Sequence, residues 1–238
     1  MHRIITTALS LLALNVGVFA ADLPSPPPPA PLPPPPSWTG FYAGLNAGAA
    51  FGDSRNSFNI AGLELPSFDI PLRGVIGGVE AGYNWQTGAL LFGLEADIDA
   101  TSMRGSRTAP CIAPLCGALA ASYEQKLPWL GTVRPRIGYV FGNWLLYATG
   151  GYAFAELDTN ANAAFGPFFA ANHRSETRNG WTLGGGTEVE FAPHWTAKLE
   201  YLYVDLGRDT TTLLSTPLIT NKSRVDTNII RTGVNYRF

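Results

Sequence analysis

The sequence predicts an all-β protein: an eight-stranded antiparallel up-and-down transmembrane β-barrel with four long extracellular loops and short periplasmic turns. Three observations support this prediction. Eight segments alternate between apolar and polar residues with a period of two, which is typical of strands with two different faces. Charged residues away from the strand ends lie on the face opposite the aromatic residues. The connections alternate between short and long, as they do in bacterial outer-membrane barrels.

The composition narrows the class of protein. Only 14% of the 238 residues are charged, whereas a typical soluble domain carries about 25%. The 26 glycines and 19 prolines disfavour a helical bundle, and the 12% aromatic content argues against disorder. A net charge of −2 argues against nucleic acid as a partner, since that function needs a basic surface. What remains is a β-rich chain whose apolar side chains face something other than water.

The N-terminal residues are typical of an exported protein. Residues 1–21 read as a signal peptide, with a basic start, an apolar stretch and a Val18-Phe19-Ala20 cleavage site; an uncleaved membrane anchor is the alternative. Residues 22–37 form a Pro-rich periplasmic leader, in which ten of the thirteen residues at 24–36 are proline. Such a run adopts polyproline II and is either a spacer or partner ligand, or a stiff leader with no binding role. The barrel is expected at 38–238.

The eight strands follow in order. They are expected at residues 38–52, 74–86, 89–100, 129–141, 144–155, 179–191, 195–206 and 227–238. The segment 144–155 is apolar on both faces, so its phase is not assigned. Pro135 lies inside a strand and cannot donate a ladder hydrogen bond, so a bulge or a weak pair is expected there.

The polarity of the two faces indicates which one meets lipid. In a soluble barrel the apolar face points inward, but here the charged face also carries many glycines, while the other face carries Trp, Tyr, Phe and Leu. The charges are therefore expected inside as ion pairs, with Glu95, Asp97 and Asp99 facing Arg134 and Arg136 on the next strand. A soluble lipocalin-like barrel with a ligand cavity is the alternative. The expected lumen charge network comprises Glu80, Glu95, Asp97, Asp99, Arg134, Arg136, Glu188, Glu190, Lys198, Glu200, Arg231 and Arg237.

The connections set the orientation. Those near 87–88, 142–143 and 192–194 are short, and those near 53–73, 101–127, 156–178 and 207–224 are long. Short turns face the periplasm and long loops face outward in barrels of this type. Five tryptophans are expected to form a periplasmic aromatic girdle close to the short turns: Trp85, Trp129, Trp144, Trp181 and Trp195.

Several segments together carry a family resemblance. The last strand ends in Phe238 with Tyr236, Val234 and Ile230 at alternate positions, similar to the C-terminal signal that the barrel-assembly machinery recognises. With WTGFYAGLNAG (38–48), GTVRPRIGYVF (131–141), LLYATGGYAF (145–154), GWTLGGGTEVEF (180–191) and KLEYLYVDLG (198–207), the chain resembles the small alphaproteobacterial outer-membrane β-barrel (porin-like) family. That family includes major surface antigens and haemin-binding members. The resemblance implies an envelope-integrity or surface role; Pro135 departs from the small residue expected between the two arginines.

Candidate chemical sites are few. His173 with Ser175 and Glu176 is the one arrangement that suggests a lipid hydrolase, but adjacency in a loop is no evidence of a positioned base. Glu95, Asp97 and Asp99 could suggest a metal site, although lumen ion pairs account for them. No catalytic residue, cofactor or metal is therefore expected. Cys111 and Cys116 lie in the second long loop, where an oxidising periplasm favours a disulfide bond that would stiffen the loop.

These features predict a bacterial outer-membrane protein that contributes to envelope structure and interacts through its loops, which are where rigid scaffolds carry function. Outer-membrane lipid, the assembly machinery and an extracellular ligand of the loops are the expected partners. The interior of an eight-stranded barrel is just wide enough for side chains, so charged residues are expected to plug the lumen. A small-solute porin or a haemin-binding surface protein is the alternative, followed by a lipid-modifying enzyme.

Overall fold

The computed structural model describes residues 37–238, except 61, 65–66, 109–118, 166–167 and 216–217. The expected signal peptide and nearly all of the Pro-rich leader lie outside the described residues, as do Cys111 and Cys116. Among the described residues there is no helix with the length and hydropathy needed to cross a membrane.

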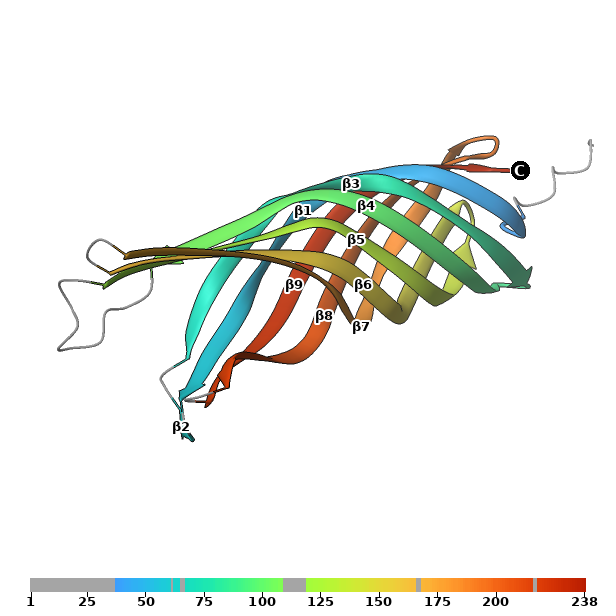
Figure 1. The fold of residues 1–238 in the computed structure, drawn as a ribbon. Coiled ribbons are helices and arrows are strands. Elements are labelled where there is room, and N and C mark those ends of the chain that lie inside the picture. Colours follow the sequence, from blue (N-terminus) through green and yellow to red (C-terminus); the bar gives the residue numbers. More distant parts are fainter. Residues whose placement is uncertain (1–36, 61, 65–66, 109–118, 166–167, 216–217) are drawn as a thin grey trace, which may run out of the picture. The chain divides into compact units, whose positions relative to one another are not determined.

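The described residues form one antiparallel sheet (Figure 1). Eight long strands follow one another as neighbours, and the two-residue strand β2 pairs only with the end of β1. The strands are β1 (Gly40–Ile60), β2 (Leu63–Glu64), β3 (Phe68–Thr87), β4 (Leu90–Thr108), β5 (Leu119–Phe141), β6 (Trp144–Phe165), β7 (Phe168–Ala192), β8 (Trp195–Ser215) and β9 (Leu218–Arg237).

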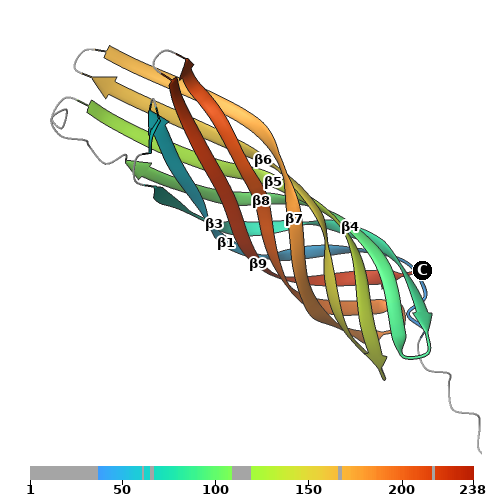
Figure 2. The same ribbon diagram turned by 90° about the horizontal axis from the view of Figure 1, so that it is seen from below.

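The sheet closes on itself between its first and last long strands. β1 pairs with β9 from Tyr42↔Arg237 to Ile60↔Ile219, and Figure 2 shows the two strands side by side. Closure leaves no sheet edge in the barrel wall. Beyond Arg73↔Arg104 and Trp181↔Asp205, the extensions of β3 and β4, and those of β7 and β8, are no longer paired with each other. The predicted eight-stranded antiparallel barrel is confirmed.

The strands are longer than the sequence pattern predicted, and the four long loops are mostly strand. β1 and β3 stay paired as far as Asn56↔Phe68, and β6 and β7 stay paired as far as Phe165↔Phe168. Beyond the apolar outer band the outward residues of β1 are polar, as at Asp53 and Arg55, so the alternation that predicted the strand ends while its backbone ladder continues. The loop boundaries expected from the sequence were therefore wrong, although the order of short and long connections is correct.

Pro135 weakens one ladder as expected. The β5–β6 pairing passes from Val133↔Tyr152 to Arg136↔Thr149 without pairs between them. On the other side, Pro135 still lies opposite Leu94 of β4. The hydroxyl of Thr149 donates a 2.9 Å hydrogen bond to the Pro135 carbonyl oxygen, which partly compensates for the missing pairs.

The structure also settles the phase of β6, which the sequence left open. Leu145 and Tyr147 point into the barrel and are buried, whereas Trp144 and Leu146 are exposed on the outer face. Two short turns need glycine: Gly88 between β3 and β4 and Gly142 between β5 and β6 adopt positive φ angles of 62°, which favours glycine.

Gly48 allows the seam between β1 and β9 to close. A methyl group there would lie 2.1 Å from the Ile230 carbonyl oxygen and 2.6 Å from Arg231 Cα. Because both are backbone atoms of β9, the strands would have to separate. We expect Gly48→Ala to lower the free energy of unfolding by about 1–3 kcal/mol, measured by urea unfolding in lipid vesicles.

Gly77 provides the matched control. A methyl group on it would meet the Asn46 carbonyl oxygen at 3.3 Å and nothing closer, so Gly77→Ala should cost less than about 1 kcal/mol. Equal losses for the two variants would show that close approach at the seam does not limit stability.

Candidate functional site: the barrel interior

The charged residues of the strands point into the barrel. Eleven of the twelve expected lumen residues are at most 8% exposed, and Glu190 is half-buried. The opposite face carries large apolar side chains that are open to the surroundings, among them Leu45 at 66% and Leu199 at 55% exposure. The polarity of the barrel is therefore the reverse of that of a soluble one.

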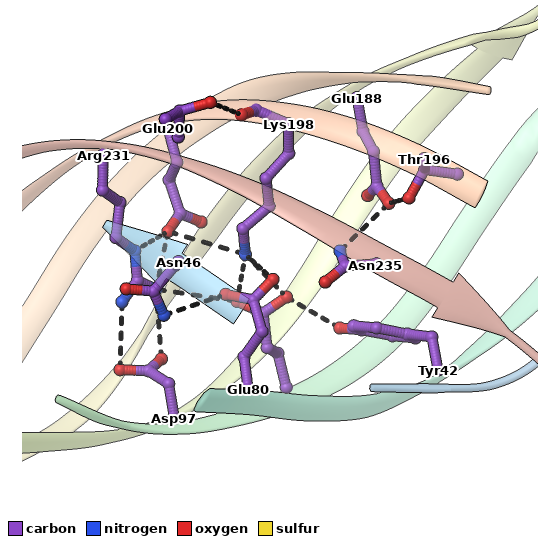
Figure 3. Close-up of polar contacts among 12 residues, drawn as sticks. Tyr42, Asn46, Glu80, Asp97, Glu188, Thr196, Lys198, Glu200, Arg231 and Asn235 are labelled. Carbon is purple, nitrogen blue, oxygen red and sulfur yellow. Dashed lines mark hydrogen bonds and ion pairs between the residues drawn. The ribbon is translucent and has the colours of Figure 1, made fainter. Parts of the chain in front are cut away.

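Arg231 of β9 joins an acid of the neighbouring strand β8 to acids of β4, which lies across the barrel. Its guanidinium group contacts Asp99 at 2.8 Å and Asp97 at 3.2 Å on β4, and Glu200 at 2.7 Å on β8. Figure 3 shows this side chain between Glu200 and Asp97. The arginine thus crosses the lumen, and its side chain is fully buried.

Two further bases complete the cluster of ion pairs. Lys198 of β8 contacts Glu80 at 2.6 Å and Glu95 at 3.1 Å. Arg134 of β5 contacts Glu95 at 2.6 Å, Asp97 at 2.8 Å and Glu200 at 3.2 Å. We call these residues, together with Asp99, Arg136, Glu188 and Arg231, the charged belt.

The structure modifies the pairing expected from the sequence. Glu95 and Asp97 face Arg134 on the neighbouring strand as expected, and Arg136 contacts Glu95 at 3.3 Å. Asp99 pairs instead with Arg231. Near the short turns, Glu190 pairs with Arg237 at 2.5 Å, apart from the charged belt.

Tyrosines that the sequence analysis did not single out support the charged belt. The hydroxyl of Tyr42 donates to Glu95 at 2.7 Å, and that of Tyr147 donates to Glu200 at 3.0 Å. The guanidinium group of Arg136 lies 4.5 Å from the Tyr42 ring centre and 5.3 Å from that of Tyr147. Tyr42 shares the inward parity of Asn46 on β1, and Tyr147 shares that of Thr149 on β6. That parity is the signal that could have identified them.

Apolar side chains fill the interior on both sides of the charged belt. A cluster of fourteen buried residues lies toward the end of the barrel that carries the strand extensions. Toward the end with the short turns lie Trp38, Leu91, Val140, Leu145 and Tyr147. The larger cluster comprises Ala50, Leu72, Ile76, Met103, Leu127, Leu130, Ala153, Ala155, Leu157, Leu202, Val204, Leu206, Val225 and Ile229. The sequence analysis missed both apolar layers.

Trp38 seals the short-turn end. It is 1% exposed, and the guanidinium group of Arg237 lies 4.7 Å from its ring centre. Its backbone N–H donates to the side chain of Gln86 at 2.8 Å. The residue that precedes β1 thus belongs to the interior of the barrel.

The expected position of the aromatic girdle was wrong for two of its five tryptophans. Trp85, Trp144 and Trp195 lie beside short turns. Trp129 lies opposite Ala100, and Trp181 lies opposite Asp205. Both tryptophans are therefore at the border between the apolar band and the strand extensions. A second girdle therefore borders the band there, as membrane barrels require at both interfaces.

The residues considered for hydrolysis do not form a catalytic arrangement. The Nδ1 atom of His173 lies 2.7 Å from Asn160 Oδ1, whereas the Ser175 hydroxyl donates to Glu156 at 2.5 Å. Glu176 pairs with Arg174 at 2.9 Å. Each side chain thus has a different partner. Among the described residues, no group of three His, Cys, Asp or Glu is placed to hold a metal ion.

The closed sheet, the two girdles and the apolar outer band define a transmembrane β-barrel. The chain belongs to the outer membrane protein beta-barrel domain family, whose model matches residues 6–238. It is 36% identical over 209 residues to the 31 kDa outer-membrane immunogenic protein of Brucella melitensis biotype 1, covering 85% of this chain and 84% of that protein. It is 30% identical over 173 residues to the 22 kDa outer membrane protein of Rhizobium leguminosarum bv. viciae, covering 71% of this chain and 64% of that protein.

A solved structure shares the fold. The outer membrane protease OmpT from Escherichia coli superimposes with a TM-score of 0.52 at 10% identity, covering 85% of this chain and 98% of OmpT. At that identity the likeness concerns the fold alone. The family and the fold together place this chain in the bacterial outer membrane, with immunogenic outer-membrane proteins among its relatives.

Proposed function

We propose that the chain is a non-enzymatic outer-membrane barrel that supports the envelope, keeps its lumen closed and presents its strand extensions for surface interaction. One observation carries this proposal: the charged belt lies between two apolar layers, and the side chains of Arg134 and Arg231 within it have no exposed area. A hydrated ion crossing the lumen would have to separate buried ion pairs and then pass through close-packed aliphatic side chains. Both steps are unfavourable.

The surface role rests on the strand extensions. The ladders continue well beyond the outer girdle, and their exposed faces are polar, as at Arg55 and Lys222. A rigid ribbon presents its tip at a fixed distance from the lipid, which suits recognition by a partner. A haemin-binding role has less support, because His173 already contacts Asn160.

A deletion strain distinguishes the proposed structural role in the envelope from the function of a small-solute pore. Cells lacking the chain should become sensitive to detergent and to bulky antibiotics, while the uptake of small hydrophilic solutes stays unchanged. Complementation with the full chain should restore resistance. A fall in solute uptake with an intact permeability barrier would contradict the proposal and favour a porin.

We also propose that the C-terminal residues act as an assembly signal, and their exposure supports this role. Ile230, Val234, Tyr236 and Phe238 are all exposed on the outer face, and Phe238 is 75% exposed. Its backbone N–H donates to the Phe41 carbonyl oxygen at 3.0 Å. The terminal aromatic ring thus lies on the outer surface, against the ring of Tyr236 at 5.3 Å between ring centres.

Deletion of Phe238 should reduce the amount of folded barrel in the outer membrane severalfold, measured as heat-modifiable protein in membrane fractions. The reason is the loss of the exposed terminal ring rather than of barrel stability. Phe238→Tyr keeps an aromatic ring and should assemble normally. Normal assembly of the deletion variant would rule out this role for the residue.

A further inference from the structure

Three bases lie in direct register on the outer face of the barrel. Arg73 of β3 is opposite Arg104 of β4, and Arg104 is opposite Lys126 of β5. All three residues are exposed. Residues opposite one another in an antiparallel pair have Cβ atoms about 5 Å apart, so the three side chains form one continuous group, which we call the basic rim.

The basic rim lies at the border between the apolar band and the polar extensions. Arg73 follows the same face as Val75, which is 65% exposed, and lies opposite Phe51 of β1, which is 43% exposed. On β5, Lys126 comes three residues before Trp129 of the outer girdle. In Figure 1, β3, β4 and β5 run side by side. Because aromatic girdles mark the membrane interfaces, we expect the headgroups of the outer leaflet at the level of the basic rim.

The charges of the basic rim are poorly compensated. Like charges directly opposite one another in a sheet are destabilising. In the part of the chain that the structure describes, Arg73 and Arg104 have no ion pair and no side-chain hydrogen bond, and Lys126 has one exposed contact, with Glu124 at 3.2 Å. The arrangement therefore favours an external anion.

Three other bases on the outer face of the extensions each have an acidic partner. Arg55 contacts Asp69 at 3.0 Å, Lys222 contacts Glu64 at 3.3 Å and Arg224 contacts Asp205 at 2.6 Å. The neighbouring strands β1, β9 and β8 carry acids in register, and the first of them lies diagonally next to Arg73: Asp53, Asp226 and Asp205. The basic rim on β3, β4 and β5 thus carries more positive charge than its neighbours Asp53 and Glu124 can balance.

We propose that the basic rim binds the phosphate group of an outer-leaflet lipid, a site that goes beyond the closed-barrel function. The planar guanidinium groups of Arg73 and Arg104 can each donate two hydrogen bonds to phosphate oxygens. The acyl chains of the same lipid would lie against Val75 and Ile98, which is 54% exposed. Headgroup and chains are therefore recognised together, and this combination distinguishes a lipid from free phosphate.

Lipid binding to the folded full chain in detergent, followed by native mass spectrometry, tests the site. The probes are diphosphoryl lipid A, the same glycolipid stripped of both phosphates, and inorganic phosphate. The wild-type protein should retain the phosphorylated lipid, and Arg73→Gln with Arg104→Gln should weaken binding at least about tenfold. The matched control, Arg55→Gln with Lys222→Gln, removes the same charge from acid-paired positions and should change binding less than about twofold.

Three results would overturn the site: unchanged binding by the Arg73/Arg104 variant, equal retention of the stripped glycolipid, or displacement of the lipid by an equimolar amount of inorganic phosphate. A second measurement does not depend on retention in the gas phase. Because like-charge repulsion is relieved, Arg104→Gln should raise the melting temperature in zwitterionic detergent and lower it when diphosphoryl lipid A is present. The same direction of change in both media would also contradict the site.

Discussion

Replacement of Arg231 by methionine is expected to destabilise the folded barrel by about 3–5 kcal/mol. The guanidinium group is buried and contacts Asp97, Asp99 and Glu200. Methionine approximates its volume but leaves these carboxylates with fewer positive partners in a space closed by apolar layers. The cost comes mainly from those uncompensated acids, because removing one partner of a buried ion pair leaves the other partner as a buried charge without a counter-charge.

Urea unfolding in lipid vesicles, followed by tryptophan fluorescence, measures this loss. Arg55→Met is the matched control: it breaks an arginine–aspartate contact of 3.0 Å in which both side chains are about half exposed. An exposed pair contributes about 0–1 kcal/mol. If the free energy of unfolding fell by the same small amount in both variants, the lumen would have to contain enough water to screen its charges.

Leu199→Arg is expected to cost about 2–4 kcal/mol, the range for a base near the bilayer midplane. Leu199 is 55% exposed on the outer face of β8, midway between Trp195 and Tyr203 along the strand. The arginine would have to enter hydrocarbon or bend toward an interface. The effect follows from depth in the membrane and not from lost packing inside the barrel.

Thr210→Arg provides the control on the same strand. Thr210 is exposed opposite Lys222, beyond the apolar band. An added base there should cost about 0–1 kcal/mol, which is the repulsion between like charges in register, and nothing for entry into hydrocarbon. Both variants are compared by equilibrium unfolding in vesicles of one lipid composition. Equal stabilities would mean that the outer face of β8 does not contact lipid.

The faces of the strands were predictable because period-two alternation fixes them. Leu199 and Glu200 are neighbours with opposite polarity, and a shift of one residue would exchange lipid and lumen. The ends of the strands were not predictable in this way. On β1 beyond the apolar band both faces are polar, so residues such as Asp53 and Arg55 carry no periodic signal even though they lie in a continuous ladder.

The position of Trp129 could have been obtained from length alone. It is twelve residues from Phe141, and strands rise about 3.3 Å per residue, so it lies roughly 40 Å along the strand from the short turn and belongs to the opposite interface. The apolar layers were harder to predict, because Leu202 and Leu199 are the same residue type. Only parity with Lys198 and Glu200 places Leu202 inside, where it is fully buried.

Single-channel recording in planar bilayers tests the closed interior most directly. The wild-type barrel, shown to be folded by its heat-modifiable mobility, should give a membrane current indistinguishable from that of protein-free bilayers across a range of salt concentrations and voltages. Reproducible conductance steps that increase in number with the amount of folded protein would contradict a closed interior. Ions would then be passing the charged belt and both apolar layers.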